Sequence, residues 1–276
     1  MSEHAAEVAR GERFEFGRNW ARFLAHLDDA RVAEAERSLR AMLGAETLAG
    51  RTFLDVGSGS GLFSLAARRL GATVRSFDYD PQSVACTREL RRRYFPGDAA
   101  WAVEEGSVLD RGYLAALGQY DVVYSWGVLH HTGAMWQALA NVAPLVRPGG
   151  NLFIAIYNRQ PILTPFWSVV KRAYVRGNGA VKRVMEWGFF ALFAGAAFLA
   201  DALRGRNPAD RHRGRNHRGM NLYRDVVDWI GGWPFEVAST DEITAFYEAR
   251  GFVPRTVVSC GGKHGCNEFV LARATD

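Results

Sequence analysis

Hydrophobic positions between residues 52 and 157 follow two periods in turn. Short runs of consecutive apolar residues, typical of buried strands, fall at 52–56, 73–77, 101–105, 120–126 and 152–157. Stretches with apolar residues three and four positions apart, typical of amphipathic helices, separate these runs at 62–70, 81–93 and 135–145. Strands that alternate with helices of this length predict an α/β fold built on a parallel, doubly wound sheet.

The pattern is helical before the first of these strands and after the last. Residues 14–28 and 31–43 place apolar side chains on one helical face, and Gly44 is a natural C-cap for the second stretch. Residues 158–235 contain apolar and amphipathic helical stretches, with a run rich in Arg, His and Asn among them. A helical insertion after the fifth strand is therefore expected.

The α/β pattern returns near the end of the chain. A helix is expected at 239–250, where Ser239 and Glu242 have the spacing of a capping box. Two further strands, 252–259 and 267–273, read as a closing hairpin. The sheet would then have seven strands, with the last one antiparallel.

Three parts of the chain are expected from these patterns. Residues 1–48 would form an N-terminal helical lid. Residues 49–158 and 237–276 would form the sheet domain, and residues 159–236 a helical insertion that recognises the substrate. Loops at the carboxyl edge of such a sheet vary and carry specificity, which is why the insertion receives that role.

Composition places the chain among folded proteins of a reducing compartment. Hydrophobic residues make up 48% of the chain and aromatic residues 12%, which is ample for a core and excludes a disordered protein. The three cysteines, Cys86, Cys260 and Cys266, form neither a CxxC pair nor a zinc-type spacing. Free thiols in the cytosol are expected.

Two features disfavour a secreted or membrane-spanning chain. Residues 1–14 have no apolar core and no cleavage signature, so no signal peptide is expected. The most apolar run, from Trp187 to Ala200, has 14 residues, which is short of the roughly 20 that cross a bilayer. We expect a cytoplasmic protein, soluble or peripheral at a membrane surface.

Charge is distributed unevenly along the chain. The net charge is +5, yet the segment from Asn158 to Met220 holds twelve Lys and Arg against three acidic residues. The insertion is therefore a basic module, and the rest of the chain is net acidic.

A glycine loop follows the first strand, in the sequence LDVGSGSG at 54–61. Gly57, Gly59 and Gly61 allow a sharp turn and let a ligand lie against main-chain N–H groups. Leu62 occupies the place where the dinucleotide pattern GxGxxG would have glycine, which disfavours a nicotinamide cofactor. Asp55, just before the loop, could approach the positive end of a bound cofactor.

Three further segments follow the next strands. Asp78, after the second strand, is placed to bind ribose hydroxyls, whereas Asp80 before Pro81 is better explained as a helix N-cap. EEGSVLD at 104–110 could hold an adenine, and SWGVLHHT at 125–132 follows the fourth strand. Because ligands of open α/β sheets bind at the carboxyl ends of the strands, all these segments would meet at one edge.

These segments resemble the ordered motifs of a known family. LDVGSGSGLFSLAARRLGA, SFDYDP, EEGSVLD, YDVVYSWGVLHHT and PLVRPGGNLFIAIYN are similar to those of class I S-adenosylmethionine-dependent methyltransferases, in particular the ubiquinone-biosynthesis-type O-methyltransferases. The resemblance covers residues 50–158, and 239–273 as the closing helix and strands. It implies a Rossmann-like sheet, S-adenosylmethionine as cofactor and S-adenosylhomocysteine as product.

The resemblance also implies roles for individual residues. Carried over by position, the cofactor site would contain Asp55, Gly57, Ser58, Gly59, Gly61, Asp78, Tyr79, Ser107, Val108, Trp126 and Gly127. The glycines would cradle the methionine part, Asp78 would hold the ribose, and Ser107 and Val108 the adenine. A lid over the cofactor carboxylate would be formed by Phe16, Arg18, Asn19 and Trp20.

One departure from the family concerns a metal. In the quinone O-methyltransferases the motif after the fourth strand resembles SEVxEH, whose carboxylates and histidine can bind a metal. Here Gly127 and His130 stand at the carboxylate positions, and His131 is retained. The sequence therefore predicts no metal site, and it does not point to a quinone as the acceptor.

Methyl transfer from a sulfonium is an in-line displacement, and a hydroxyl or protonated amine acceptor also requires a base. His131 and His130 lie beside the expected position of the methyl group, and Tyr157 could orient the acceptor. The alternative is that one histidine packs against the sheet or caps the following helix. Substrate contacts are expected from Asn158, Arg218, Tyr223 and Trp229, with Asp225, Asp228 and Glu236 as reserve bases.

Several functions remain open at this point. The insertion could be an amphipathic element for a membrane surface or lipid substrate, a cap for an anionic small molecule, or an ordinary helix pair with a solvated basic loop. Methylation of a small molecule is favoured, RNA methylation is the alternative because a basic segment could meet phosphates, and an NAD(P)-dependent oxidoreductase or a silent cofactor-binding partner protein is less favoured. The acceptor atom (O, N, C or S) and the oligomeric state are not predicted.

Overall fold

The computed structural model describes residues 3–205, 222–262 and 265–275. The chain divides into two compact units. Unit 1 comprises Met1–Phe14 and Pro165–Trp233, and unit 2 comprises Glu15–Thr164 and Pro234–Asp276. Residues 15–48 of the expected lid thus fall in unit 2, and most of the expected insertion falls in unit 1 together with the first residues of the chain.

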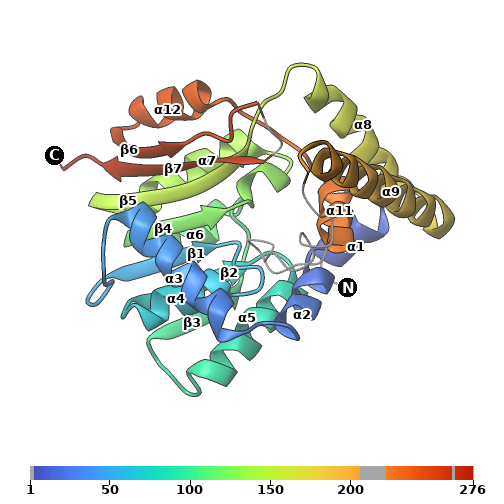
Figure 1. The fold of residues 1–276 in the computed structure, drawn as a ribbon. Coiled ribbons are helices and arrows are strands. Elements are labelled where there is room, and N and C mark those ends of the chain that lie inside the picture. The colour runs from blue at the N-terminus through green and yellow to red at the C-terminus, as the bar shows by residue number, and fades with distance from the viewer. Residues whose placement is uncertain (1–2, 206–221, 263–264, 276) are drawn as a thin grey trace. The chain divides into compact units, whose positions relative to one another are not determined.

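Unit 2 is built on the predicted seven-stranded sheet, in the order β3-β2-β1-β4-β5-β7-β6. Its strands are β1 (Thr52–Val56), β2 (Thr73–Asp78), β3 (Trp101–Glu105), β4 (Tyr120–Trp126), β5 (Val146–Tyr157), β6 (Phe252–Val258) and β7 (Cys266–Arg273). Figure 1 shows them in this order, from β6 at the top to β3 at the bottom. β1 to β5 are parallel neighbours and β7 is antiparallel to β5 and β6, which confirms the predicted fold class.

Helices cover both faces of the sheet and bury two apolar clusters. One face packs against α3 (Asp29–Leu43), α4 (Leu62–Arg69) and α5 (Pro81–Tyr94). The other packs against α6 (Arg111–Leu117), α7 (Met135–Val142) and α12 (Thr240–Glu248). The strands divide their side chains between the clusters in alternation, since Phe53 joins the first and Leu54 and Val56 the second.

The predicted helix ends have the expected caps. Asp80 accepts the N–H of Gln82 ahead of Pro81, Ser239 and Glu242 form the capping box, and Gly44 has a left-handed conformation at the end of α3. These residues supply partners for main-chain groups that a helix end cannot satisfy internally.

Three elements differ from the expectation. α6 was not predicted, because Leu114 is its one buried residue and so short a stretch shows no period. β5 begins at Val146 rather than at 152, because Val146 pairs with Tyr120 before a bulge that contains the Pro-Gly-Gly turn. The helix expected at 14–28 is confined to α2 (Gly17–Leu24).

Unit 1 is helical and contains α1 (Glu3–Ala9), most of α8 (Leu163–Arg176), α9 (Gly179–Leu203) and α11 (Leu222–Gly231). Trp167 of α8 contacts the rings of Phe189 and Phe193 of α9 and of Trp229 of α11. The buried ammonium of Lys171 donates to the carbonyl of Trp229. Asn178 begins α9 by accepting the N–H groups of Ala180 and Val181.

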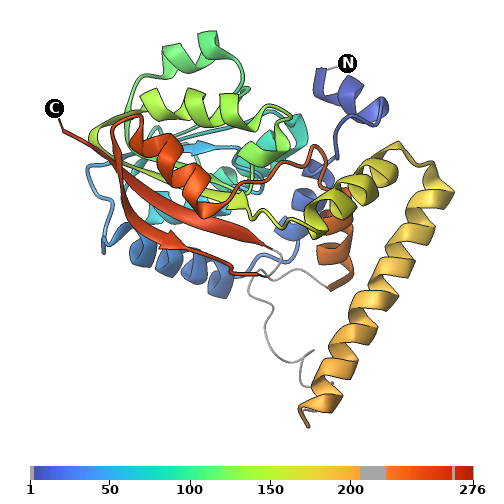
Figure 2. The same cartoon turned by 90° about the horizontal axis from the view of Figure 1, so that it is seen from above.

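α9 corrects the estimate of membrane-crossing length. The apolar run Trp187 to Ala200 is the middle of a 25-residue helix (Figure 2). An 18-residue window of this helix has a mean hydropathy of 1.4, and it is the one helix among the described residues long and apolar enough to cross a membrane by length and composition. The sequence run was too short because it ended at the charged residues Glu186 and Asp201, whereas the helix continues beyond both.

Candidate functional site

The direction of the chain reverses between β1 and β4, at the middle of the sheet. From β1 the chain proceeds outward through β2 to β3, whereas β4 pairs with the other edge of β1 and leads to β5. Crevices at such switch points are where open α/β sheets bind ligands. The glycine loop follows β1 and the SWGVLHHT segment follows β4, so both lie at this point.

The glycine loop approaches the segment after β4 too closely for any side chain. A Cβ at Gly57 would overlap the methyl groups of Val128, and Gly57 has a φ of +79°. Gly61 has a φ of +81°, and a Cβ there would lie 2.9 Å from the Cα of Thr87 in α5. Glycine is therefore required at both positions.

Main-chain groups of the loop are held by β2. The N–H groups of Gly57 and Ser58 donate to the carbonyl of Phe77, at 2.9 and 3.1 Å. Asp78, the next residue, accepts the N–H of Gly59 and of Asp80, both at 2.9 Å. Burial raises the pKa of Asp78 to about 6. The expected ribose ligand thus lies directly beside the loop.

Asp55 is enclosed beneath the loop. Strand alternation places it on the face of α3, α4 and α5, where its side chain is 2% exposed and accepts a hydrogen bond from Ser64. Ser64 also bonds Ser76 at 2.7 Å, and the indole N–H of Trp101 donates to Ser76 at 2.9 Å. Burial, with the neighbouring charge of Asp78, raises the pKa of Asp55 to about 7.

The segment after β3 forms a turn that leads into α6. The hydroxyl of Ser107 accepts the N–H of Leu109 at 3.2 Å, and Asp110 caps α6. Val108 is 6% exposed and belongs to the apolar cluster, and its carbonyl accepts from Asn141. Adenine binding by Ser107 and Val108 stays a prediction.

Residues 15–24 reach three parts of this edge. The N–H of Gly17, at the start of α2, donates to the Asp80 carboxylate at 2.8 Å. The indole of Trp20 lies 3.1 Å from where a Cβ of Gly59 would stand, and the ring of Phe16 is 4.9 Å from that of His131. Arg18 is exposed and pairs with Glu15 at 3.1 Å. Trp20 therefore lies on the glycine loop, and the role of these residues as a lid stays a prediction.

The two histidines after β4 have opposite hydrogen-bonding roles. His131 Nδ1 lies 2.6 Å from the carbonyl oxygen of Pro234, which accepts, so Nδ1 carries the proton and the lone pair of the neutral ring is on Nε2. His130 is fully buried, and its Nδ1 accepts the main-chain N–H of Tyr157 at 3.3 Å. In the neutral ring of His130 the proton is thus on Nε2.

Residues 234–238 return to the site and hold it together. Glu236 accepts the N–H of Met135 at 2.9 Å, which caps α7, and its own N–H donates to the carbonyl of His130. Half-burial of the carboxyl raises the pKa of Glu236. Phe235 lies 5.5 Å from the ring of Tyr157. Neither Pro234 nor Phe235 was expected here, because no local pattern links them to a strand end about a hundred residues earlier.

The remaining candidates have other surroundings. The side chain of Asn158 bonds Gly261 and Asn267 in the closing hairpin, at 2.7 and 3.1 Å. In unit 1, Tyr223 donates to Glu186, and the carbonyl of Trp229 accepts from Lys171. Arg218 lies outside the described residues. Their roles toward a substrate stay predictions.

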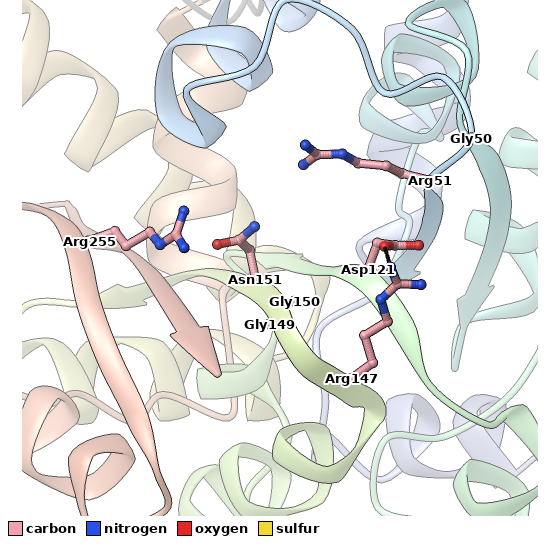
Figure 3. Close-up of a pocket in the computed structure, with 8 residues that line it drawn as sticks. All are labelled: Gly50, Arg51, Asp121, Arg147, Gly149, Gly150, Asn151 and Arg255. Carbon is pink, nitrogen blue, oxygen red and sulfur yellow. Dashed lines mark ion pairs between the residues drawn. The ribbon is translucent and has the colours of Figure 1, made fainter. Parts of the chain in front are cut away.

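No group of three His, Cys, Asp or Glu residues within the described ranges could hold a metal ion. Figure 3 shows a pocket of 390 Å³ at the opposite, amino edge of the sheet, lined by Gly50, Arg51, Asp121, Arg147, Gly149, Gly150, Asn151 and Arg255. Asp121 pairs there with Arg147 at 2.6 Å and accepts two hydrogen bonds from Thr52. These contacts tie the starts of β1, β4 and β5 together, away from the glycine loop.

Comparison with known proteins gives matches over the same region. Residues 54–152 match the family model described as a methyltransferase domain. A ubiquinone biosynthesis O-methyltransferase of Methylobacterium sp. is 33% identical over 142 residues, which are 49% of this chain and 51% of that protein. A tRNA U34 carboxymethyltransferase of Methylococcus capsulatus is 37% identical over 108 residues, 39% of this chain and 32% of that protein. The chain thus spans about half of the length of the first relative and about a third of that of the second.

The fold is also similar to that of a solved structure. The magnesium protoporphyrin IX methyltransferase of Synechocystis, determined with bound S-adenosylhomocysteine, aligns with a TM-score of 0.56 at 13% identity. The alignment covers 98% of this chain and 100% of that chain. This likeness concerns the fold.

Gly57→Ala tests the close approach of the glycine loop, with Gly50→Ala as its matched control. Both glycines have similar φ, +79° and +74°, but nothing lies within 4 Å of a Cβ at Gly50. In each variant the free energy of unfolding should fall by about 1 kcal/mol, because alanine is strained at a positive φ. Overlap with Val128 should lower that of Gly57→Ala by a further ~1–3 kcal/mol in urea unfolding.

S-adenosylhomocysteine binding, measured by calorimetry, should weaken by about tenfold or more in Gly57→Ala and stay unchanged in Gly50→Ala. Adding Val128→Ala to Gly57→Ala provides room for the new methyl group and should restore part of the stability. Equal losses of stability in the two single variants would contradict the close approach.

Asp55→Asn tests the burial of that carboxyl. The pKa of about 7 exceeds the ordinary value of 3.8, so the folded chain holds a proton that the unfolded chain has lost. This contribution to the free energy of unfolding is present at low pH and disappears as the pH rises through 7. Asn keeps an oxygen for Ser64 without titrating, so the free energy of unfolding of the variant should rise by about 2–3 kcal/mol relative to that of wild type between pH 5 and pH 8.

Asp98→Asn is the control, because the contribution of Asp98 to stability has the opposite pH dependence. Urea unfolding of both variants is measured at pH 5 and pH 8. The hydrogen bond from Arg68 lowers the pKa of Asp98, so its contribution to stability is present at neutral pH and is lost as the pH falls through that lowered pKa. Asp98→Asn should therefore lose stability relative to wild type at pH 8. An Asp55→Asn variant with the pH dependence of wild type would show that Asp55 is ionised and solvated.

Proposed function

We propose that this chain, which carries a class I S-adenosylmethionine-dependent methyltransferase domain, methylates a small-molecule acceptor and releases S-adenosylhomocysteine. The observation that supports this most directly is the glycine loop at the switch point between β1 and β4, with Asp78 beside it. The family match and the relatives described as O-methyltransferases favour an oxygen acceptor.

The residues present fit the cofactor in chemistry. The glycines of the loop leave its main chain without side chains of its own at the two places where Val128 lies against Gly57 and the indole of Trp20 against Gly59. Asp78 would accept from ribose hydroxyls, Gly57 and Gly59 would face the methionine part, and Trp126, Gly127 and Tyr79 would complete the walls. S-adenosylmethionine supplies a methyl group on a positively charged sulfur, which leaves as a neutral thioether.

His131 is the proposed general base. Its Nδ1–H is fixed by the Pro234 carbonyl, so Nε2 is the nitrogen that can take the acceptor proton. His130 has the other tautomer and is fully buried, which suits a positioning role. Tyr157, whose ring lies 4.0 Å from that of His130, would orient the acceptor.

The side chains around His131 favour a lipophilic or aromatic acceptor. Phe16 and Tyr157 contact the His131 ring, and Phe235 contacts the ring of Tyr157, so aromatic side chains line this part of the site. RNA methylation is the second candidate, because of the basic segment and the match to a tRNA carboxymethyltransferase.

Cell extract incubated with the protein and deuterated S-adenosylmethionine identifies the acceptor by mass spectrometry. We expect a trideuteromethyl tag on a compound of the lipophilic fraction. A tag on RNA alone would establish the second candidate, and no tag in any fraction would contradict the enzyme.

His131→Asn should separate catalysis from binding. The Asn amide can still donate to the Pro234 carbonyl but provides no nitrogen at the Nε2 position, so methyl transfer should fall by about 10²–10⁴-fold. S-adenosylhomocysteine affinity should remain that of wild type. The control is His130→Asn, whose oxygen can accept from the Tyr157 N–H. A larger loss of turnover in His130→Asn than in His131→Asn would reverse the assignment.

A further inference from the structure

α9 exposes many of its apolar side chains, while Phe189 and Phe193 and all its charged residues except Arg183 turn toward the rest of unit 1. Its most exposed large apolar residues are between 58% and 79% accessible, and they are Val184, Trp187, Leu192, Phe198, Leu199 and Leu203. All positions of α9 are described, and Arg183 is the one charged residue among the exposed ones. A surface helix of a globular protein normally has the reverse arrangement.

The inward polar residues are held by other parts of unit 1. Glu186 accepts hydrogen bonds from the hydroxyls of Tyr174 and Tyr223, both at 2.6 Å. The ammonium of Lys182 lies 5.8 Å from the centre of the Tyr174 ring, and Asp201 is 4% exposed. These contacts fix which face of α9 points outward, so the apolar face belongs to the folded unit.

Length and hydropathy alone would allow α9 to cross a bilayer, but the difference between its two faces argues against a spanning helix. A spanning helix has hydrocarbon or protein on every side, and Lys182, Glu186 and Asp201 would lie at different depths within it. An apolar outer face above a protein-bound inner face that holds the charged residues fits a helix that lies along the membrane surface.

Charge favours a lipid surface over a second copy of the chain. Arg183 near the beginning of α9 and Arg204 at its end are exposed, and residues 158–220 carry twelve Lys and Arg against three acidic residues. Two copies joined through this face would bring like charges together, whereas anionic headgroups would neutralise them. Trp187, close to the basic end, is a residue type enriched at membrane interfaces.

We propose that the outer face of α9 docks on an anionic phospholipid membrane, with the helix axis along the membrane plane and its apolar side chains among the lipid chains. The docking does not depend on the identity of the methyl acceptor. It would bring the enzyme to lipophilic acceptors dissolved in the bilayer.

Vesicle flotation of the full chain tests this docking. Phosphatidylcholine vesicles with and without phosphatidylglycerol are compared for wild type and for the triple variant Leu192→Gln, Phe198→Gln, Leu199→Gln. Wild type should float with the anionic vesicles, and the affinity of the variant for them should be lower by about tenfold or more. The substituted side chains are exposed, so the fold of unit 1 should be retained.

A second triple variant, Val253→Gln, Val257→Gln, Val258→Gln, is the matched control, because these residues are exposed by 41% to 58% on β6. It should float like wild type. S-adenosylhomocysteine binding, measured on the same preparations, separates a docking defect from a folding or cofactor defect.

Three results would overturn the docking proposal. They are flotation of the α9 variant at the wild-type level, absence of flotation of a wild-type protein that binds S-adenosylhomocysteine, and a wild-type dimer that the α9 variant converts to monomer without any flotation. The last would assign the face to a second copy of the chain.

Discussion

A close approach of the main chain of the glycine loop after β1 to the Val128 side chain in the segment after β4 organises the carboxyl edge of the sheet. Because Gly57 has no side chain, Val128 packs directly against it. The following residues then form the short turn Leu129–His131, which places both histidines beside the end of β5. On the other side of the loop, Gly59 donates to Asp78. The proposed binding groups and the proposed base therefore both depend on the contact between Gly57 and the Val128 side chain.

Sequence periodicity was sufficient for the sheet, because parallel central strands are buried on both faces and read as apolar runs. β1, β3 and β4 begin and end at the predicted residues, and the caps at Asp80 and Ser239 were also predicted. The glycine loop and Asp78 were found for the same reason, since their spacing is local. α6 was missed because seven residues with one buried side chain carry no period.

The parts of the site that depend on distant residues could not be predicted. The tautomer of His131 follows from the Pro234 carbonyl, 103 positions away in the chain, and α7 is capped from Glu236. The orientation of α9 is of the same kind. Its composition predicts an apolar helix, but the inward direction of Glu186 comes from the hydroxyls of Tyr174 and Tyr223. Only the packed unit shows that the apolar face is outside.

Thermal unfolding of the full chain with S-adenosylhomocysteine or NAD tests most directly whether this edge of the sheet binds the sulfonium cofactor. A ligand present at about 100 times its Kd stabilises the folded state by ~2.7 kcal/mol, which raises Tm by about 5–10 °C for a chain of this size. The account predicts this rise with S-adenosylhomocysteine and no rise with NAD. A rise with NAD and none with S-adenosylhomocysteine would contradict it.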